Sequence, residues 1–246
     1  MKLYSELTTN IMKLMLIILI AVAAVSTLAT LAYIIDIDFY IDYAYDVDNF
    51  AGIMQLVIFY INLIVFLVWI YRVHVDMKSL FPNHSRGPGG ALACVMIPIY
   101  NLFYGISSTF LRIGKSMQSL PAASTPGRII GVLAIPLTII IWVTNAVERS
   151  VQRQDSPNEY VLLLSGILDI VLFTVYLTIC LQVALGLRQA LSSRIATTEA
   201  AALAVGDESA GDTIEEIETA SEDQVAATES ESAVTTGLSL DKRPSE

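Results

Sequence analysis

The sequence has few of the residues from which catalytic and metal sites are built. It contains 2 cysteines and 2 histidines in 246 residues, and no G-x-S-x-G, H-E-x-x-H or P-loop pattern. Cys94 and Cys180 lie inside apolar segments, which excludes a disulfide framework or a cysteine-rich metal site and indicates apolar filling. His74 and His84 are ten residues apart with no cysteine near, so we predict that both are solvated. We expect no enzyme activity, no metal and no cofactor.

Charge is also scarce. Only 15% of the residues are charged, against about a quarter in soluble domains. No basic stripe with interleaved aromatic residues occurs, so we expect no nucleic-acid partner. The acidic residues are concentrated at one end: from Glu199 onward there are 13 acidic and 2 basic residues, whereas residues 1–198 are nearly neutral.

Apolar residues are abundant, at 54% of the chain, and occur in runs near 20 long. Such runs predict an all-α integral membrane protein with four transmembrane helices, at 14–35, 50–70, 129–147 and 160–187. The first run is too long for a signal peptide, whose apolar core is about 7 to 15 residues. Residues 1–192 therefore form the predicted four-helix membrane domain. Residues 193–246 form a predicted disordered acidic tail, because Ala, Glu, Ser and Thr bury too little apolar surface.

A further apolar segment, GPGGALACVMIPIYNLFYGISS at 87–108, contains a proline. Residues 90–97 give only about 12 Å of helix at 1.5 Å per residue, too short to span, and Pro98 favours a break. Beyond it, apolar residues recur every three or four positions while Asn101, Arg112 and Lys115 lie on another stripe. We predict a re-entrant or interfacial amphipathic segment at 90–118, with Arg112 and Lys115 near anionic lipid headgroups. A kinked fifth span at 90–111 is the alternative.

The distribution of Lys and Arg favours four spans. With four spans and an internal N-terminus, 10 basic residues lie inside and 2 outside, whereas five spans give 7 against 5; basic residues accumulate in cytoplasmic loops. We expect a multi-pass plasma-membrane protein whose N-terminus and tail are cytoplasmic. The five aspartates of residues 36–49 then fall in an external loop, read as solvated and flanked by an aromatic belt rather than as a calcium site.

Asp169 lies inside the last apolar run. A carboxylate there costs several kcal/mol, on the order of 2.5 to 3.5 on insertion scales, unless it is protonated, paired or hydrated. Asn62 lies at a similar depth of the second run, so we predict a hydrogen bond between Asp169 and Asn62, with Tyr176 or Ser165 nearby. A polar clasp between helices is favoured over a proton or cation relay, because the core offers no partner base.

Three stretches resemble a bacterial and archaeal membrane family, domain of unknown function 4328. They are WIYRVHVDMKSL at 69–80, GPGGALACVMIPIYNL at 87–102 and FLRIGKSM at 110–117. The family features fall on Trp69, Tyr71, Arg72, Pro88, Gly89, Pro98, Asn101 and Leu102. The resemblance covers about residues 14–190 and implies fold and membrane location without implying an activity.

Two functions remain open. The first is a non-enzymatic membrane scaffold or regulatory module, whose partners are the lipid bilayer and an unknown protein bound by the tail. The alternative is a small transport or ion and proton permeation unit that uses Asp169 and the re-entrant segment. Four spans make a small pathway, so this alternative requires a homo-oligomer.

Overall fold

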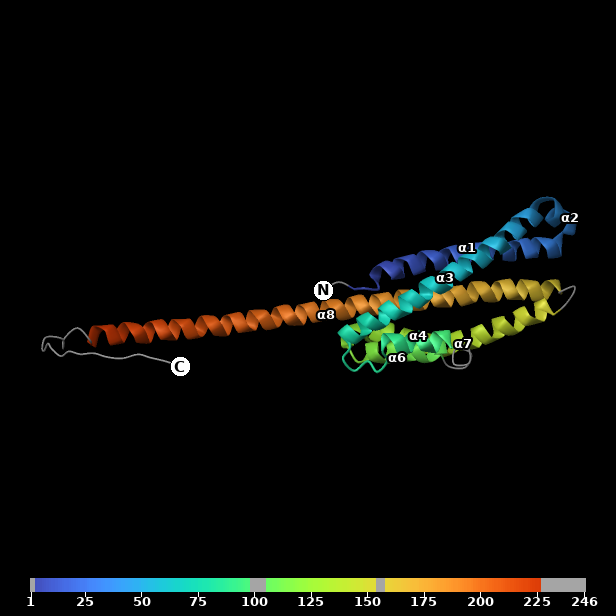
Figure 1. Cartoon of the computed structure of the whole chain (residues 1–246). Helices are drawn as coiled ribbons and strands as arrows, with labels where there is room; N and C mark the ends of the chain where they lie inside the picture. The colour runs from blue at the N-terminus through green and yellow to red at the C-terminus, as the bar shows by residue number, and fades with distance from the viewer. Residues whose placement is uncertain (1–2, 98–104, 154–157, 227–246) are drawn as a thin grey trace, which may run out of the picture. The chain divides into compact units, whose positions relative to one another are not determined.

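The computed structural model describes residues 3–97, 105–153 and 158–226, and each element in these ranges is helical (Figure 1). The chain divides into two units, Met1–Ile195 and Ala196–Glu246. In chain order the elements are α1 (Glu6–Ile35), α2 (Ile37–Phe39), a π-helical turn η1 (Tyr40–Ala44), α3 (Tyr45–Leu80), α4 (Pro88–Met96), α6 (Ile106–Gln118), a 3-10 turn η3 (Pro121–Ala123), α7 (Ser124–Gln152) and α8 (Glu159–Ala226).

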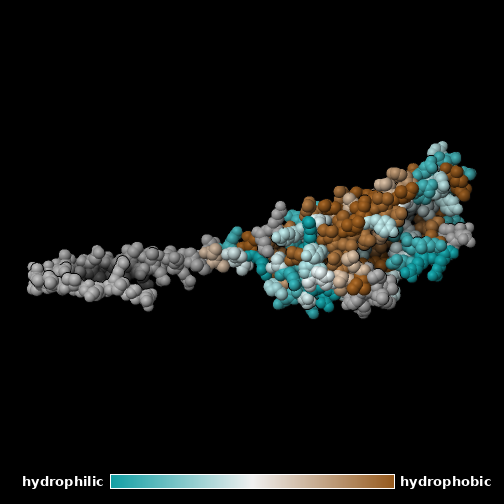
Figure 2. Space-filling view, viewed as in Figure 1, coloured by the Kyte–Doolittle hydropathy of each residue, from teal (hydrophilic) through white to brown (hydrophobic). Residues whose placement is uncertain are grey.

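Four of these helical stretches are long and apolar enough to cross a membrane, which confirms the predicted number. They are Glu6–Ile35, Ile37–Leu80, Pro121–Gln152 and Glu159–Ala202. In the first unit, apolar side chains cover the middle of the visible face and hydrophilic residues gather at its two ends (Figure 2). This distribution is that of a surface whose middle faces lipid.

The prediction of a loop at residues 36–49 is wrong, because this segment is helical. Asp36 is the one extended residue between α1 and α2, and its side chain accepts hydrogen bonds from the backbone N–H groups of Asp38 and Phe39. The carboxylate therefore caps a new helix immediately after the old one ends. The chain then continues through η1 into α3, and Asp38, Asp42 and Asp46 remain exposed.

In the described part of the segment between α3 and α7, the α-helices are α4 and α6. α4 has nine residues, about 13 Å at 1.5 Å per residue, and is too short to span a bilayer. Pro98, where a break is predicted, and Asn101 both lie outside the described residues. His84, before α4, has its Nδ1 2.8 Å from the Oγ of Ser116, in the last turn of α6. The residue before α4 and the last turn of α6 are thus in contact.

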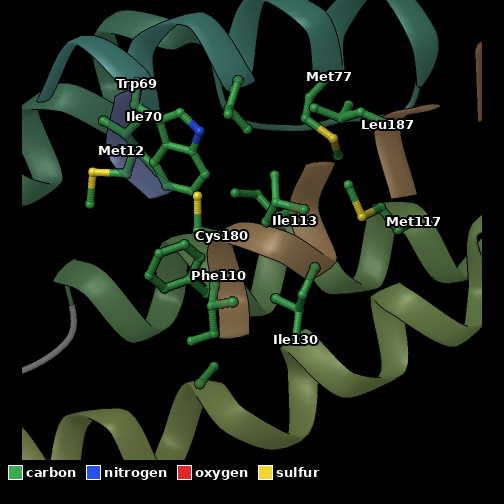
Figure 3. Packing of buried hydrophobic residues seen from close by; sticks show 14 of the residues in the cluster. Met12, Trp69, Ile70, Met77, Phe110, Ile113, Met117, Ile130, Cys180 and Leu187 are labelled. Carbon is green, nitrogen blue, oxygen red and sulfur yellow. The ribbon is translucent and has the colours of Figure 1, made fainter. Parts of the chain in front are cut away.

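The predicted amphipathic phase of α6 is present in the structure. Phe110, Ile113 and Met117 are buried, whereas Arg112 and Lys115 are exposed. The apolar face, however, packs into the protein core, where Figure 3 shows these three side chains among residues of α1, α3, α7 and α8. α6 is therefore an integral part of the bundle.

Glycines allow α6, α7 and α8 to approach closely. A Cβ on Gly114 of α6 would lie 2.7 Å from the carbonyl oxygen of Gly127 on α7, and a Cβ on Gly127 would lie 2.7 Å from that of Gly114. A Cβ on Gly186 of α8 would lie 2.6 Å from the sulfur of Met117. Small residues at helix contacts of this kind are typical of membrane bundles, in which packing drives helix association.

The predicted disordered tail is not confirmed. α8 begins at Glu159, where the Asn158 side chain accepts a hydrogen bond from the Tyr160 N–H, and it continues to Ala226. The described part of the predicted tail, 193–226, is thus helical, and residues 227–246 lie outside the described residues.

Candidate functional site

A line of hydrogen-bonding side chains runs along α3 at intervals of seven residues. Its members are Asp48, Gln55, Asn62, Trp69 and Asp76. Because seven residues make almost two turns, these side chains stay near one side of the helix, drifting by about 20° at each step. The line is about 42 Å long at 1.5 Å per residue, which is the thickness of a bilayer with its headgroups. We name these five residues the α3 polar line.

The two ends of the α3 polar line bind α1. At one end, Asp48 accepts hydrogen bonds from the hydroxyls of Ser26, at 2.7 Å, and Tyr40, at 3.0 Å. At the other end, Asp76 is 1% exposed and accepts hydrogen bonds from the backbone N–H groups of Tyr4 and Ser5, at 3.0 and 2.8 Å. Asp76 thus holds the start of α1 against the last turns of α3, and Asp48 holds the later part of α1 against the start of α3.

Near the middle, the partner of Asp169 is Gln55 rather than the predicted Asn62. The Nε2 of Gln55 donates to the Oδ2 of Asp169 at 2.9 Å, which joins α3 to α8. One turn earlier on α8, the Ser165 hydroxyl donates to Glu148 of α7 at 3.5 Å. Asn62 is buried one step further along the polar line, and its Oδ1 has no hydrogen-bond partner among the described residues.

Trp69, a residue of the family resemblance, belongs to the larger core cluster. Its ring is 1% exposed and packs beside Phe66 and Phe110. Its Nε1–H donates to the hydroxyl of Thr9 on α1 at 3.0 Å, so the one polar atom of this large buried side chain is satisfied. Arg72, in the next turn, is half-buried.

The prediction that both histidines are solvated is wrong. His74 and His84 are 0% and 5% exposed, and their ring centroids are 5.3 Å apart. His74 Nδ1 lies 2.8 Å from the carbonyl oxygen of Ile70, and because that oxygen can only accept, Nδ1 carries the proton. The Nε2 atoms of both rings are buried without a partner among the described residues.

Three cations lie near His84. Arg86 is 8% exposed, and its Nη1 donates to the hydroxyls of Thr109 at 2.7 Å and Ser108 at 3.3 Å on α6. Arg112 donates to the Ser85 hydroxyl at 3.1 Å. Burial lowers the pKa of His84, and the positive charges of Arg86, Arg112 and Lys78 lower it further. We name Lys78, Arg86 and Arg112 the cationic cluster.

Several elements meet at one end of the first unit. This end contains the start of α1, the end of α3, the helices α4 and α6, and the start of α7. It also contains the turn of α8 around Arg188, whose guanidinium is 3.0 Å from the Glu6 carboxylate. We name this the basic end. Among the described ranges, no group of three His, Cys, Asp or Glu side chains is placed to hold a metal ion.

Comparison with known proteins finds a family to which part of this chain is similar. A family model described as Domain of unknown function (DUF4328) matches residues 39–108. The resemblance drawn from the sequence motifs is thereby confirmed over that range. The match contains the whole α3 polar line, α4 and the cationic residues Lys78 and Arg86. No curated protein and no solved structure matches the chain.

Two features of the site were not predicted from the sequence, although one of them had a signal there. The seven-residue spacing of Asp48, Gln55, Asn62, Trp69 and Asp76 is visible in the sequence, but α3 was predicted to begin at residue 50 and end at 70, so the line was cut at both ends. The burial of Arg86 had no such signal, because the hydroxyls that hold it lie on α6, more than twenty residues away.

Proposed function

We propose that this chain is a non-enzymatic membrane scaffold or regulatory module of the plasma membrane. In this proposal the four candidate spans cross the bilayer, and α4 and α6 form a re-entrant hairpin on the cytoplasmic side. The N-terminus and the C-terminal part of the chain lie on that same side, where the latter is available to a protein partner.

The contact between His84 and Ser116 supports the re-entrant arrangement. A fifth span between these residues would separate its ends by about 30 Å, the thickness of the hydrocarbon core, whereas the two side chains are 2.8 Å apart. The excess of Lys and Arg at the same end supports its cytoplasmic location. The bonds of the α3 polar line support a scaffold role, because they fix α1 and α8 to α3 rather than leaving a polar path open.

Cysteine labelling in sealed vesicles tests the proposal. Single cysteines at Ser85 and Thr125, both exposed, are introduced into a chain in which Cys94 and Cys180 have been replaced by alanine. Both should react with a membrane-impermeant maleimide from the same side, and a cysteine at the exposed Tyr43 should react only from the other. Labelling of Ser85→Cys and Thr125→Cys from opposite sides would disprove the hairpin.

The alternative, a small proton or ion permeation unit, is favoured by one observation. Asp169 has a neutral amide as its partner, and no Lys, Arg or His side chain lies within 4.0 Å of it among the described residues. Proton flux into liposomes containing the purified chain separates the two functions. A permeation unit gives a flux that Asp169→Asn abolishes, whereas a scaffold gives no flux above that of empty liposomes.

A further inference from the structure

Arg86 is a buried cation whose charge nothing in the described chain neutralises. Its guanidinium lies in a residue that is 8% exposed, and no carboxylate of the described residues is within 4.0 Å of it. The nearest carboxylate along α3, Asp76, already accepts two backbone hydrogen bonds from the start of α1. Burying a guanidinium without a counter-charge is unfavourable, so the position indicates an anion that the chain itself does not supply.

The surroundings of Arg86 fix the guanidinium in place. The hydroxyls of Ser108 and Thr109 both donate to the carbonyl oxygen of Gly105, at 3.2 and 2.7 Å. Their oxygens are therefore left to accept from Arg86 Nη1, which they do. The first turn of α6 thus holds one edge of the guanidinium, and such a pre-oriented planar group suits an oxyanion better than a mobile side chain does.

Further positive groups converge on the same place. Lys78 Nζ lies 3.7 Å from the position that a Cβ on Gly87 would take, which puts the ammonium at the start of α4. Gly87 provides no side-chain cap for α4, so the first-turn N–H groups of that helix have no side-chain acceptor there. A Cβ on Gly89, in this turn, would meet nothing within 4 Å. The first turn of α4 therefore has open space beside Gly89.

A buried neutral histidine completes the evidence for a ligand. His84 is 5% exposed, and its Nε2 has no partner in the described chain although Nδ1 is bonded to Ser116. Lys78, Arg86 and Arg112 all act on His84 electrostatically, so the imidazole lies among the three cations. A neutral ring with Nε2 protonated adds a hydrogen-bond donor to a site that otherwise contains cations.

We propose that Lys78, Arg86, Arg112 and the N-terminus of α4 form a binding site for a phosphate group at the basic end. Phosphate carries the tetrahedral set of oxygens that a guanidinium, an ammonium and helix N–H groups bind together. The phosphate of an anionic phospholipid headgroup and a free phosphate ion share this chemistry. The site adds a ligand to the proposed membrane function. It depends on that proposed function only if the phosphate belongs to a lipid.

Calorimetric titration of the purified full chain in an uncharged detergent tests the site. Dioctanoyl phosphatidic acid should bind saturably, and zwitterionic dioctanoyl phosphatidylcholine should not. Arg86→Gln should raise the dissociation constant for phosphatidic acid at least tenfold. The matched control is Arg128→Gln, which removes an exposed cation of the same end and should change the constant less than twofold.

Titration with a third ligand, inorganic phosphate, distinguishes a lipid headgroup from a free phosphate ion. If inorganic phosphate binds with the same dependence on Arg86, the site takes the free ion. If phosphatidic acid alone does so, the site takes a lipid headgroup. Equal weakening by Arg86→Gln and Arg128→Gln, or equal binding of phosphatidylcholine, would overturn the proposal.

A second variant covers the case in which Arg86→Gln does not fold. Lys78→Gln combined with Arg112→Gln changes two exposed side chains and leaves the buried arginine in place. It should raise the dissociation constant about tenfold, and an unchanged constant would overturn the proposal. Failure of the vesicle labelling would remove the re-entrant arrangement but leave this binding result standing, so the two ideas fail separately.

Discussion

Gln55 on α3 donates a hydrogen bond to Asp169 on α8, with 2.9 Å between Nε2 and Oδ2. Each residue lies ten positions beyond the start of its helix, Tyr45 for α3 and Glu159 for α8. Further along both helices, Phe66 and Tyr176 make a T-shaped aromatic contact, so the two helices run in the same direction. Equal depth in parallel helices is therefore the reason that this amide and this carboxylate meet.

Removing the amide should destabilise the bundle. Gln55→Met keeps the length of the side chain but leaves the Asp169 carboxylate without its donor, so we expect a loss of about 1 kcal/mol, the scale of interhelical hydrogen bonds in membranes. Thr174→Val is the control, because the exposed Thr174 hydroxyl bonds only its own helix, at Ile170. Thermal unfolding in detergent measures both. Equal midpoints for the two variants would contradict a stabilising role for the Gln55 bond.

Asp76 should determine how firmly the start of α1 is held. Its two oxygens accept from the N–H groups of Tyr4 and Ser5, and Asp76→Asn replaces one acceptor with a donor and removes the charge. Breaking a buried bond of this kind costs about 1 to 3 kcal/mol. Hydrogen exchange at the N-terminal amides should become faster, whereas exchange in the middle of α7 should not change. Unchanged exchange at residues 4 and 5 would show that the carboxylate is not the anchor.

The number of spans was predictable because long apolar runs are a strong signal, but the Asp169 partner was not. Depth along α3 was counted from Phe50, where the apolar run begins, and this placed Asn62 level with Asp169. The helix begins at Tyr45 instead, because Asp36 caps a new helix and the chain needs no loop. An error of a few residues in a helix start therefore moved the predicted partner by two turns.

The helical phase of α6 was also predictable, since apolar and basic residues separate cleanly on its two faces. What covers the apolar face was not predictable: Ile113 and Met117 would suit either lipid or protein. The close contact of Gly114 with Gly127 shows that protein, rather than lipid, covers this face. This contact depends on the turn between α6 and α7. His84 and Arg86 were misjudged for a related reason, because polar residues in a short connection give no indication that hydroxyls of α6 will cover them.

The contact between α6 and α7 makes a specific prediction about Gly114. Gly114→Ala would place a methyl group 2.7 Å from the Gly127 carbonyl oxygen and 3.1 Å from the backbone nitrogen of Gly131. Overpacking of this kind costs about 1 to 3 kcal/mol. Gly52→Ala is the matched control, because nothing lies within 4 Å of its Cβ position. Thermal unfolding should show a lower midpoint for Gly114→Ala alone. If both variants unfold like the parent chain, the two helices are not in backbone contact.

The burial of His84 predicts how stability changes with pH. Because its pKa is lowered in the folded chain, the unfolded chain binds a proton more readily as the pH falls below about 6.5, the ordinary value for histidine. Folding should therefore lose stability on acidification below that pH, and stability above it should not depend on this group. The groups around the ring are His74, whose Nδ1–H donates to the Ile70 carbonyl oxygen, and the cations Lys78, Arg86 and Arg112. His84→Gln keeps an amide that can hydrogen-bond to Ser116 but cannot bind the proton. Denaturation at pH 7.5 and pH 5.5 should show a smaller difference for His84→Gln than for the parent chain, and an equal difference would mean that His84 remains able to take up a proton in the folded protein.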